Sequence, residues 1–146
     1  MRKISILGST GSIGVQTLEV LEQLPDEFEI ESLTANNNIA LLELQCEKYK
    51  PKKIAISNKE AYKHFISQTT FKGAVFCGHE GVVQSVAEGS DIVMSALVGF
   101  AGVEPTIAAI ESGADIALAN KETLVAAGSV VMKHVRHHGV RMIAVD

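Results

Sequence analysis

An apolar segment near the amino terminus runs directly into three glycines spaced three residues apart, and this junction constrains the fold more than any other feature. The segment predicts a strand over residues 3–7, and the glycines are Gly8, Gly11 and Gly14. Gly8 allows a turn that a side chain would obstruct, Gly11 lets the main chain approach a phosphate, and Gly14 permits close packing of helix on strand. A helix that starts near Ile13 turns unpaired N–H groups and the positive end of its dipole toward an anion. The junction therefore predicts a phosphate-binding turn.

The glycine spacing is G-x-x-G-x-x-G, so it meets the usual dinucleotide fingerprint only in part. Ser9, Thr10 and Ser12 lie between the glycines, and small hydroxyls beside exposed amides add donors for a phosphate. These hydroxyls favour a bound nucleotide over the alternative, a tight strand-to-helix turn without a ligand.

Length and composition exclude several classes of protein. The 146 residues suit one domain with its own core, and we expect a single unit over residues 1–146. A net charge of −4 offers no basic stripe, which argues against a nucleic-acid partner. No apolar run reaches the length of a membrane span, and the first one breaks at Gly8, too early for a secretory leader, so we expect a cytoplasmic protein without a membrane partner. Cys46 and Cys77 lie far apart and form no C-x-x-C pattern, which is typical of reduced core thiols.

Apolar runs alternate with segments of helical period along the whole chain. This alternation is typical of β-α repeats around a parallel sheet, and it predicts a Rossmann-like, doubly wound, mainly parallel α/β fold with helices on both faces. We expect strands at residues 3–7, 29–35, 53–57, 74–76, 91–96, 115–118 and 142–145. Six helices are expected. Five lie at residues 13–24, 39–49, 59–68, 80–87 and 122–138, with a bend in the last at 128–129, and one more, before that last helix, is expected between Pro105 and Gly113.

The informative segments follow strands of this predicted sheet. They are residues 8–14, 36–38, 98–102 and 120–122, together with Asp146. Because ligands of such sheets bind beyond the carboxyl ends of the strands, these segments are expected to share one rim and to form one site.

The end of the second strand indicates which nucleotide is preferred. An NAD site usually places a carboxylate there for the ribose hydroxyls, whereas this chain has Asn36, Asn37 and Asn38, while Glu29 and Glu31 lie within the strand and are expected to face solvent. A 2′-phosphate would meet no repelling charge, so NADP is favoured over NAD. The asparagines supply hydrogen-bond donors but no charge, and they also suit a turn and a helix cap.

A second polar cluster, Asn120, Lys121 and Glu122, opens the last helix. Its alternatives are a ligand-binding group and a helix cap followed by two solvated charges. Further along, His134, His137 and His138 lie at helical spacing, where they are expected to complement the helix dipole rather than to bind a metal.

Together these segments resemble the N-terminal, NADPH-binding domain of the 1-deoxy-D-xylulose 5-phosphate reductoisomerase family. The resemblance covers essentially the whole chain, and the matching strings occur in the family's order. They are LGSTGSIG at 7–14, VGFAG at 98–102 with Pro105 and Thr106, LANKE at 118–122 with Leu124 and Val125, and Val145-Asp146.

The resemblance implies a role for each matched residue. Thr10, Gly11, Ser12 and Ile13 would bind the pyrophosphate side of NADPH, Asn38 would contact the adenosine end, and Asn120 and Glu122 would lie nearer the nicotinamide. Gly8, Asn36 and Asn37 are also expected to belong to the cofactor site, because of their places in the glycine turn and at the end of the second strand. Lys121 would bind the phosphorylated sugar substrate, and Asp146 would be a ligand of Mg²⁺ or Mn²⁺. The family's full-length proteins are expected to be homodimers.

The chain also departs from the family's pattern. Many members have glycine and then a basic residue where this chain has Asn36 and Asn37. In the family, the Val-Asp pair at 145–146 is followed by Ser-Glu-His and later by a further metal ligand and a flap. The chain is therefore expected to be a portion of the enzyme that has no activity alone. The alternatives are a non-catalytic NADP-binding module and a semialdehyde dehydrogenase, which would need Cys46 or Cys77 as a nucleophile.

Overall fold

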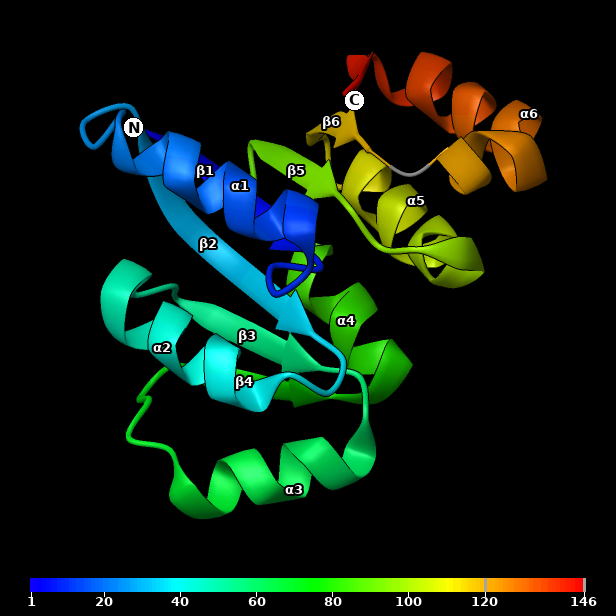
Figure 1. The fold of residues 1–146 in the computed structure, drawn as a ribbon. Coiled ribbons are helices and arrows are strands. Elements are labelled where there is room, and N and C mark those ends of the chain that lie inside the picture. Colours follow the sequence, from blue (N-terminus) through cyan, green and yellow to red (C-terminus); the bar gives the residue numbers. More distant parts are fainter. Residues whose placement is uncertain (120, 146) are drawn as a thin grey trace.

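A computed structural model describes residues 1–119 and 121–145 of the chain. Its centre is a seven-stranded sheet in the order β4-β3-β2-β1-β5-β6-β7, in which every pair of neighbouring strands is parallel (Figure 1). The strands are β1 (Arg2–Leu7), β2 (Phe28–Ala35), β3 (Lys53–Ile56), β4 (Ala74–Cys77), β5 (Ile92–Ser95), β6 (Asp115–Leu118) and β7 (Met142–Ala144). The predicted doubly wound α/β fold is confirmed, and the sheet is parallel throughout.

Each predicted helix is present with small differences at its ends. The helices are α1 (Ser12–Glu22), α2 (Ile39–Tyr49), α3 (Lys59–Gln68), α4 (Gly78–Val86), α5 (Val103–Glu111) and α6 (Lys121–His138). A short 3₁₀ helix, η1 (Gly99–Gly102), precedes α5 and was not predicted. The bend expected in α6 is confirmed, because Ala127 has non-helical torsion angles (φ −140°, ψ 24°). No helix in the described part of the chain is long and apolar enough to cross a membrane.

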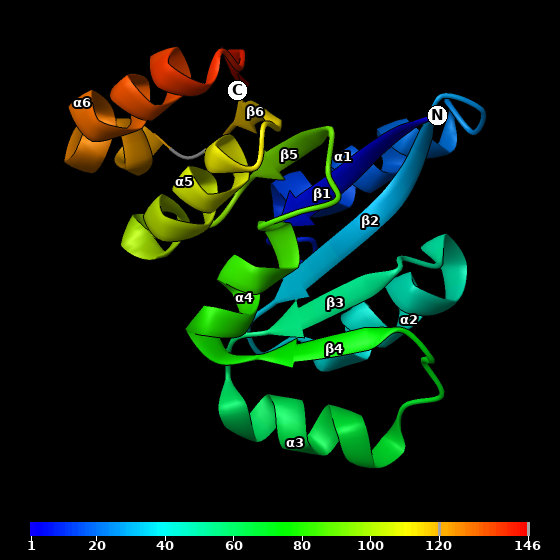
Figure 2. The same cartoon turned by 180° about the vertical axis from the view of Figure 1, so that it is seen from behind.

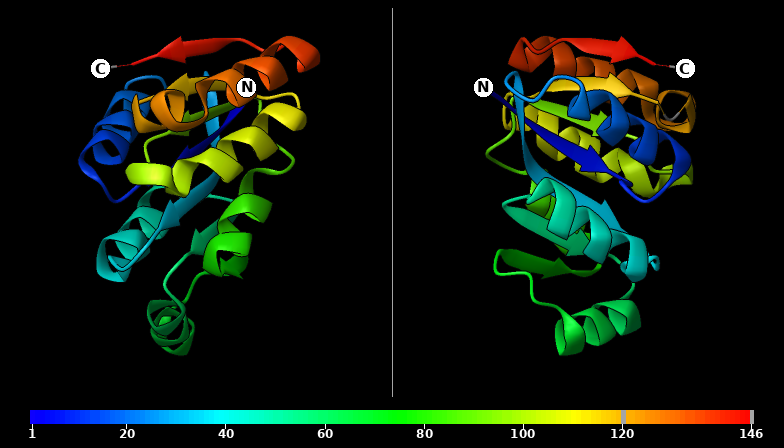
Figure 3. Two further views of the ribbon diagram at one scale, coloured as in Figure 1. Left: turned by 90° about the vertical axis from the view of Figure 1, so that its right-hand side faces the viewer. Right: turned by 60° about the vertical axis from the view of Figure 1, so that its left-hand side comes forward.

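The chain winds outward from β1 in one direction and then in the other, which places helices on both faces of the sheet. From β1 it steps to β4 through α1, α2 and α3, and it then crosses back to β5, β6 and β7 through α4, α5 and α6. Figure 1 shows α1 and α2 in front of the sheet, and Figure 2 shows α4 and α5 covering the opposite face. Figure 3 shows β7, in red, along one edge of the sheet beside α6.

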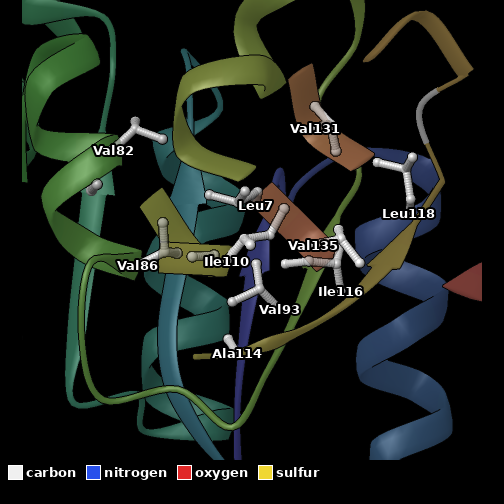
Figure 4. Packing of buried hydrophobic residues seen from close by; sticks show 12 residues of the cluster. Leu7, Val82, Val86, Val93, Ile110, Ala114, Ile116, Leu118, Val131 and Val135 are labelled. Carbon is white, nitrogen blue, oxygen red and sulfur yellow. The ribbon is translucent and has the colours of Figure 1, made fainter. Parts of the chain in front are cut away.

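Two apolar clusters, one on each face, form the core. Along β1 the side chains alternate, so Ile6 packs on one face with Leu18 of α1. Leu7 packs on the other face, in the cluster that Figure 4 shows. The first cluster continues through α2 and α3, and the second through α4, α5 and α6. Both neighbours on β1 are fully buried, so the central strand belongs to both cores.

One prediction about β2 is wrong. Glu31 was expected to face solvent, yet only 8% of its side chain is exposed. Its carboxylate lies 3.4 Å from the Lys53 ammonium and 3.8 Å from the Lys52 ammonium, and it fills the space beside Gly89. The two lysines come from the start of the neighbouring strand segment, so a cross-strand ion pair keeps this carboxylate inside.

Candidate dinucleotide-binding site

The turn after β1 is shaped by two glycines that no other residue replaces without strain. Gly8 has a φ of +85°, and its N–H donates to the Thr34 hydroxyl at 2.9 Å. A Cβ on Gly14 would lie 2.2 Å from the Gly8 carbonyl oxygen and 2.6 Å from the Ser9 Cα. These atoms belong to the backbone and cannot move aside, so Gly14 brings α1 against the turn as the sequence predicts.

The amino end of α1 is open. Its N-cap is Gly11, and no side chain among the described residues caps it. The next two helices differ, because Asn38 accepts from the Leu41 N–H at 3.2 Å and Asn58 accepts from the Ala61 N–H at 2.9 Å. Gly11 and Ser12 are exposed, and Thr10 and Ile13 are half-buried beside them. The first amides of α1 therefore face the rim, where an anion can reach them.

Ser9 does not contribute its hydroxyl to this open rim, contrary to the sequence-based expectation. The side chain is fully buried and donates to Gln45 Oε1 at 2.8 Å, while Gln45 Nε2 donates to the Ser9 carbonyl at 2.8 Å. The Ser9 N–H also bonds to the Thr34 carbonyl at 2.9 Å. Through its two hydrogen bonds with Ser9, Gln45 of α2 holds the glycine turn in place on its buried side. Sequence reasoning missed this contact because the two residues lie 36 positions apart.

The three asparagines after β2 are exposed and differ in their local roles. Asn38 caps α2 through its side chain, as the sequence suggested. The Asn37 carbonyl accepts from the Ile39 N–H at 2.8 Å. The Asn36 carboxamide oxygen accepts from the Ser57 hydroxyl at 2.8 Å, which joins the ends of β2 and β3. All three lie at the same rim as the glycine turn, because β1 and β2 are parallel neighbours.

On the other side of β1, the ends of β5 and β6 meet at the same rim. The Gly99 N–H in η1 donates to Glu122 Oε2 at 2.6 Å, so a predicted cofactor residue also holds the turn after β5. Val98 and Phe100 are 86% and 73% exposed on either side of this contact. Lys121 is the first residue of α6. Asn120 and Asp146, predicted for the cofactor and the metal, lie outside the described residues.

The described residues contain no group of three or more histidine, cysteine or carboxylate side chains that could hold a metal ion. The histidines near the end of α6 stack on one another, and His138 Nδ1 lies 3.0 Å from the His134 carbonyl oxygen, which suits the predicted role at a helix terminus. Cys46 is buried in α2, and burial, followed by the charges of Glu43 and Glu47, raises the pKa of its thiol to about 12.

The fold and the glycine turn define a class first: this is a Rossmann-like α/β domain with open backbone amides at the carboxyl ends of its strands. Residues 4–128 match the sequence profile of the family described as 1-deoxy-D-xylulose 5-phosphate reductoisomerase. The chain belongs to this family, as the sequence motifs indicated.

Individual relatives agree with this assignment. The 1-deoxy-D-xylulose 5-phosphate reductoisomerase of Geotalea uraniireducens (strain Rf4) is 47% identical over 148 residues, which cover 100% of this chain and 38% of that protein. The reductoisomerase from Zymomonas mobilis in complex with NADPH has a TM-score of 0.93 and 35% identity, over 99% of this chain and 38% of that one. A DOX-P reductoisomerase in complex with NADPH, fosmidomycin and magnesium has a TM-score of 0.94 and 34% identity, over 99% and 36% of the two chains. The chain therefore spans little more than a third of the length of these relatives.

Proposed function

We propose that this chain is the NADPH-binding part of a 1-deoxy-D-xylulose 5-phosphate reductoisomerase. The main support for this proposal is that the amino end of α1 is uncapped. It lies above a turn whose backbone leaves no room for a side chain at position 14. Backbone amides and a helix dipole suit a pyrophosphate. The cradle that residues 8–14 form with these groups is therefore compatible with a dinucleotide. Solved members of the family hold NADPH.

The cofactor would lie along the rim, across the end of β1. The amides of residues 10–13 would hold the pyrophosphate, with Gly8 setting the turn beneath it. The adenosine would lie toward residues 36–38 after β2, and the nicotinamide toward Asn120 and Glu122 after β6. This order follows from the sheet, because β2 and β5 flank β1 on opposite sides.

Bound NADPH supplies a hydride. In the complete enzyme the carbon skeleton of 1-deoxy-D-xylulose 5-phosphate would be rearranged and then reduced to 2-C-methyl-D-erythritol 4-phosphate. Lys121 would hold the phosphorylated sugar through fixed positive charge, at the start of α6. Asp146 would be one ligand of Mg²⁺ or Mn²⁺, and the described residues build no metal site of their own.

A semialdehyde dehydrogenase is not favoured. Such an enzyme needs a nucleophilic thiolate beside the nicotinamide. The Cys46 thiol is buried in α2, in the apolar cluster away from the rim, and a pKa raised to about 12 keeps it protonated. Cys77 ends β4 at the far edge of the sheet from β6. A non-catalytic NADP-binding module would use the same cradle, but it offers no reason for the reductoisomerase motifs.

Four finer features belong to the same proposal: the substrate, the oligomeric state, the location, and the lack of nucleic-acid and membrane partners. The fosmidomycin complex of a relative is compatible with a small phosphorylated substrate. A homodimer and a cytoplasmic location stay predictions, as does the lack of nucleic-acid and membrane partners, which rests on the net charge of −4 and on the apolar pattern of the sequence.

The cradle is tested by adding a negative charge at the amino end of α1. We expect the chain to bind NADPH in a calorimetric titration and Ser12→Asp to lose most of that affinity while its melting temperature stays the same or rises, because an acidic residue there favours the helix and repels the pyrophosphate. Gln16→Asp, an exposed position one turn further along α1, is the matched control and should bind normally. Absence of NADPH binding by the folded chain, or normal binding by Ser12→Asp, would contradict the proposal.

The expected lack of activity is tested separately. With substrate, NADPH and Mg²⁺, the 146-residue chain should consume no NADPH above background in a steady-state assay. Turnover by this chain would show that it carries the complete catalytic machinery, contrary to the proposed division.

A further inference from the structure

The rim after β2 has no cation of its own, although a cofactor with a 2′-phosphate would bring a double negative charge there. In Rossmann-like domains the adenosine ribose lies at the end of the second strand, and a nearby arginine or lysine usually meets the phosphate. Here residues 34–38 are a threonine, an alanine and three asparagines. The positive charge must come from another segment.

The loop between β3 and α3 is a direct neighbour of these asparagines. Ala35 pairs with Ile56 in the sheet, and the Ser57 N–H donates to the Ala35 carbonyl at 3.0 Å. The Ser57 hydroxyl donates to Asn36 Oδ1 at 2.8 Å. The two loops therefore leave the sheet side by side, and the residues after Ser57 flank the predicted position of the ribose.

Lys59 is the cation that this loop brings to the rim. The chain has 13 lysines and arginines, and only Lys59 and Lys121 fall in the first helical turn after a strand. Lys121 follows β6, three strands away from β2, whereas Lys59 follows β3, the direct neighbour of β2. Lys59 is exposed and forms no ion pair with residues 1–119 or 121–145.

The position of Lys59 is not explained by helix stability. It is the first residue of α3, where the helix dipole disfavours a positive charge. Lys63, one turn later, differs because it pairs with Glu60 at 3.8 Å. A residue that breaks a local rule without a structural gain points to a functional role.

We propose that Lys59 binds the 2′-phosphate of NADPH and so sets the preference for NADPH over NADH. The inference rests on the proposed function. In the structure the Lys59 Cε lies 3.8 Å from the position that a Cβ on Gly78 would take, so the lysine stem passes beside the backbone just after β4. The four-carbon stem is exposed and flexible, which lets the ammonium turn from Gly78 toward Asn36.

The test compares two cofactors that differ only in the phosphate. We expect the chain to bind NADPH more tightly than NADH in calorimetric titrations. Lys59→Met should weaken NADPH binding about tenfold, the loss expected for one charge-assisted contact, and leave NADH binding unchanged. Lys63→Met, which removes the other lysine of α3, is the matched control and should change neither affinity.

A rescue variant distinguishes recognition from a general loss of structure. Asn37→Lys in the Lys59→Met background returns a cation to the end of β2 and should restore the preference for NADPH. Equal affinity of the unchanged chain for NADPH and NADH, or a Lys59→Met variant that loses both or neither, would overturn this inference and leave the proposed cradle intact. A folded chain that binds neither cofactor would instead overturn the proposed function, and the inference with it.

Discussion

At the scale of single residues, two glycines of the same turn have separate roles, because Gly14 is needed for packing and Gly11 for the approach of a phosphate. A Cβ on Gly14 would lie 2.2 Å from the Gly8 carbonyl oxygen, whereas a Cβ on Gly11 would meet its nearest atom at 3.7 Å. Gly14→Ala should therefore cost about 3 kcal/mol or more, because a backbone overlap has to be relieved. Gly11→Ala should cost less than about 1 kcal/mol, yet weaken NADPH binding by placing a methyl group where the phosphate approaches. Urea unfolding and cofactor titration of both variants measure the two effects. Equal losses of stability would contradict this separation.

Gln45 supports the turn through a pair of buried hydrogen bonds with Ser9. Removing one partner leaves buried polar atoms unpaired, so Gln45→Met and Ser9→Ala should each destabilise the chain by about 1 to 3 kcal/mol. The double variant should cost less than the sum, although the Ser9 carbonyl still loses a donor. A double-mutant cycle from urea unfolding measures the coupling. Simple additivity would show that the two side chains act independently.

At the scale of elements, one carboxylate links three strands of the sheet, β1, β6 and β7, at their amino ends. Asp115, at the start of β6, accepts from the Arg141 N–H at 2.9 Å and from its guanidinium at 3.2 Å, and it lies 3.4 Å from the Arg2 guanidinium. The contact with the Arg141 backbone is the main cause that holds the pKa of Asp115 below its ordinary value. Arg141 precedes β7, so Asp115 fixes the start of the strand that leads to Asp146.

This contact predicts a specific acid sensitivity. Because the pKa of Asp115 is lower in the folded chain than in the unfolded chain, its stabilising contribution is complete above the unfolded value of about 4 and is lost as the pH falls through the folded pKa. Asp115→Asn should therefore be less stable than the unchanged chain near pH 7, and the difference should shrink as the pH falls below about 4 and through the lowered pKa of the folded chain. Urea midpoints measured across this range check the sign. A difference that grows at acid pH would contradict it.

The order of elements was predictable because it depends on local periodicity, and the contacts that cross between elements were not. The alternation of apolar residues, together with Gly, Pro and Asn at turns and helix ends, predicts the bounds of every strand and of the six α-helices to within a few residues. Glu31 breaks the alternation rule because two lysines from another segment stabilise its burial. Ser9 is likewise withdrawn from the rim by Gln45, and Glu122 is joined to Gly99 across 23 residues. The sequence predicts which rim carries the candidate site, but not which of the polar groups at that rim already bond to other residues.

At the scale of the whole molecule, the sheet separates two cores that share β1. Ile6 and Leu7 are consecutive and fully buried, each in a different cluster, so neither face can lose its packing without disturbing the central strand. Because β1 leads directly into the glycine turn, the packing on both faces of the sheet supports the candidate site.

Matched substitutions on the two faces test whether the cores unfold together. Ile54 lies in one cluster and Ile116 in the other, and both are almost completely buried. Ile54→Val and Ile116→Val should each cost about 0.5 to 1.5 kcal/mol, and the double variant should lose the sum, because the sheet and its central strand separate the two sites. Unfolding in urea, followed by far-ultraviolet circular dichroism and by hydrogen exchange of amides on each face, should give one transition with an unchanged slope for all variants. If Ile54→Val released the α1–α3 face at lower urea than the α4–α6 face, the two cores would be independent, and the shared strand would not couple them.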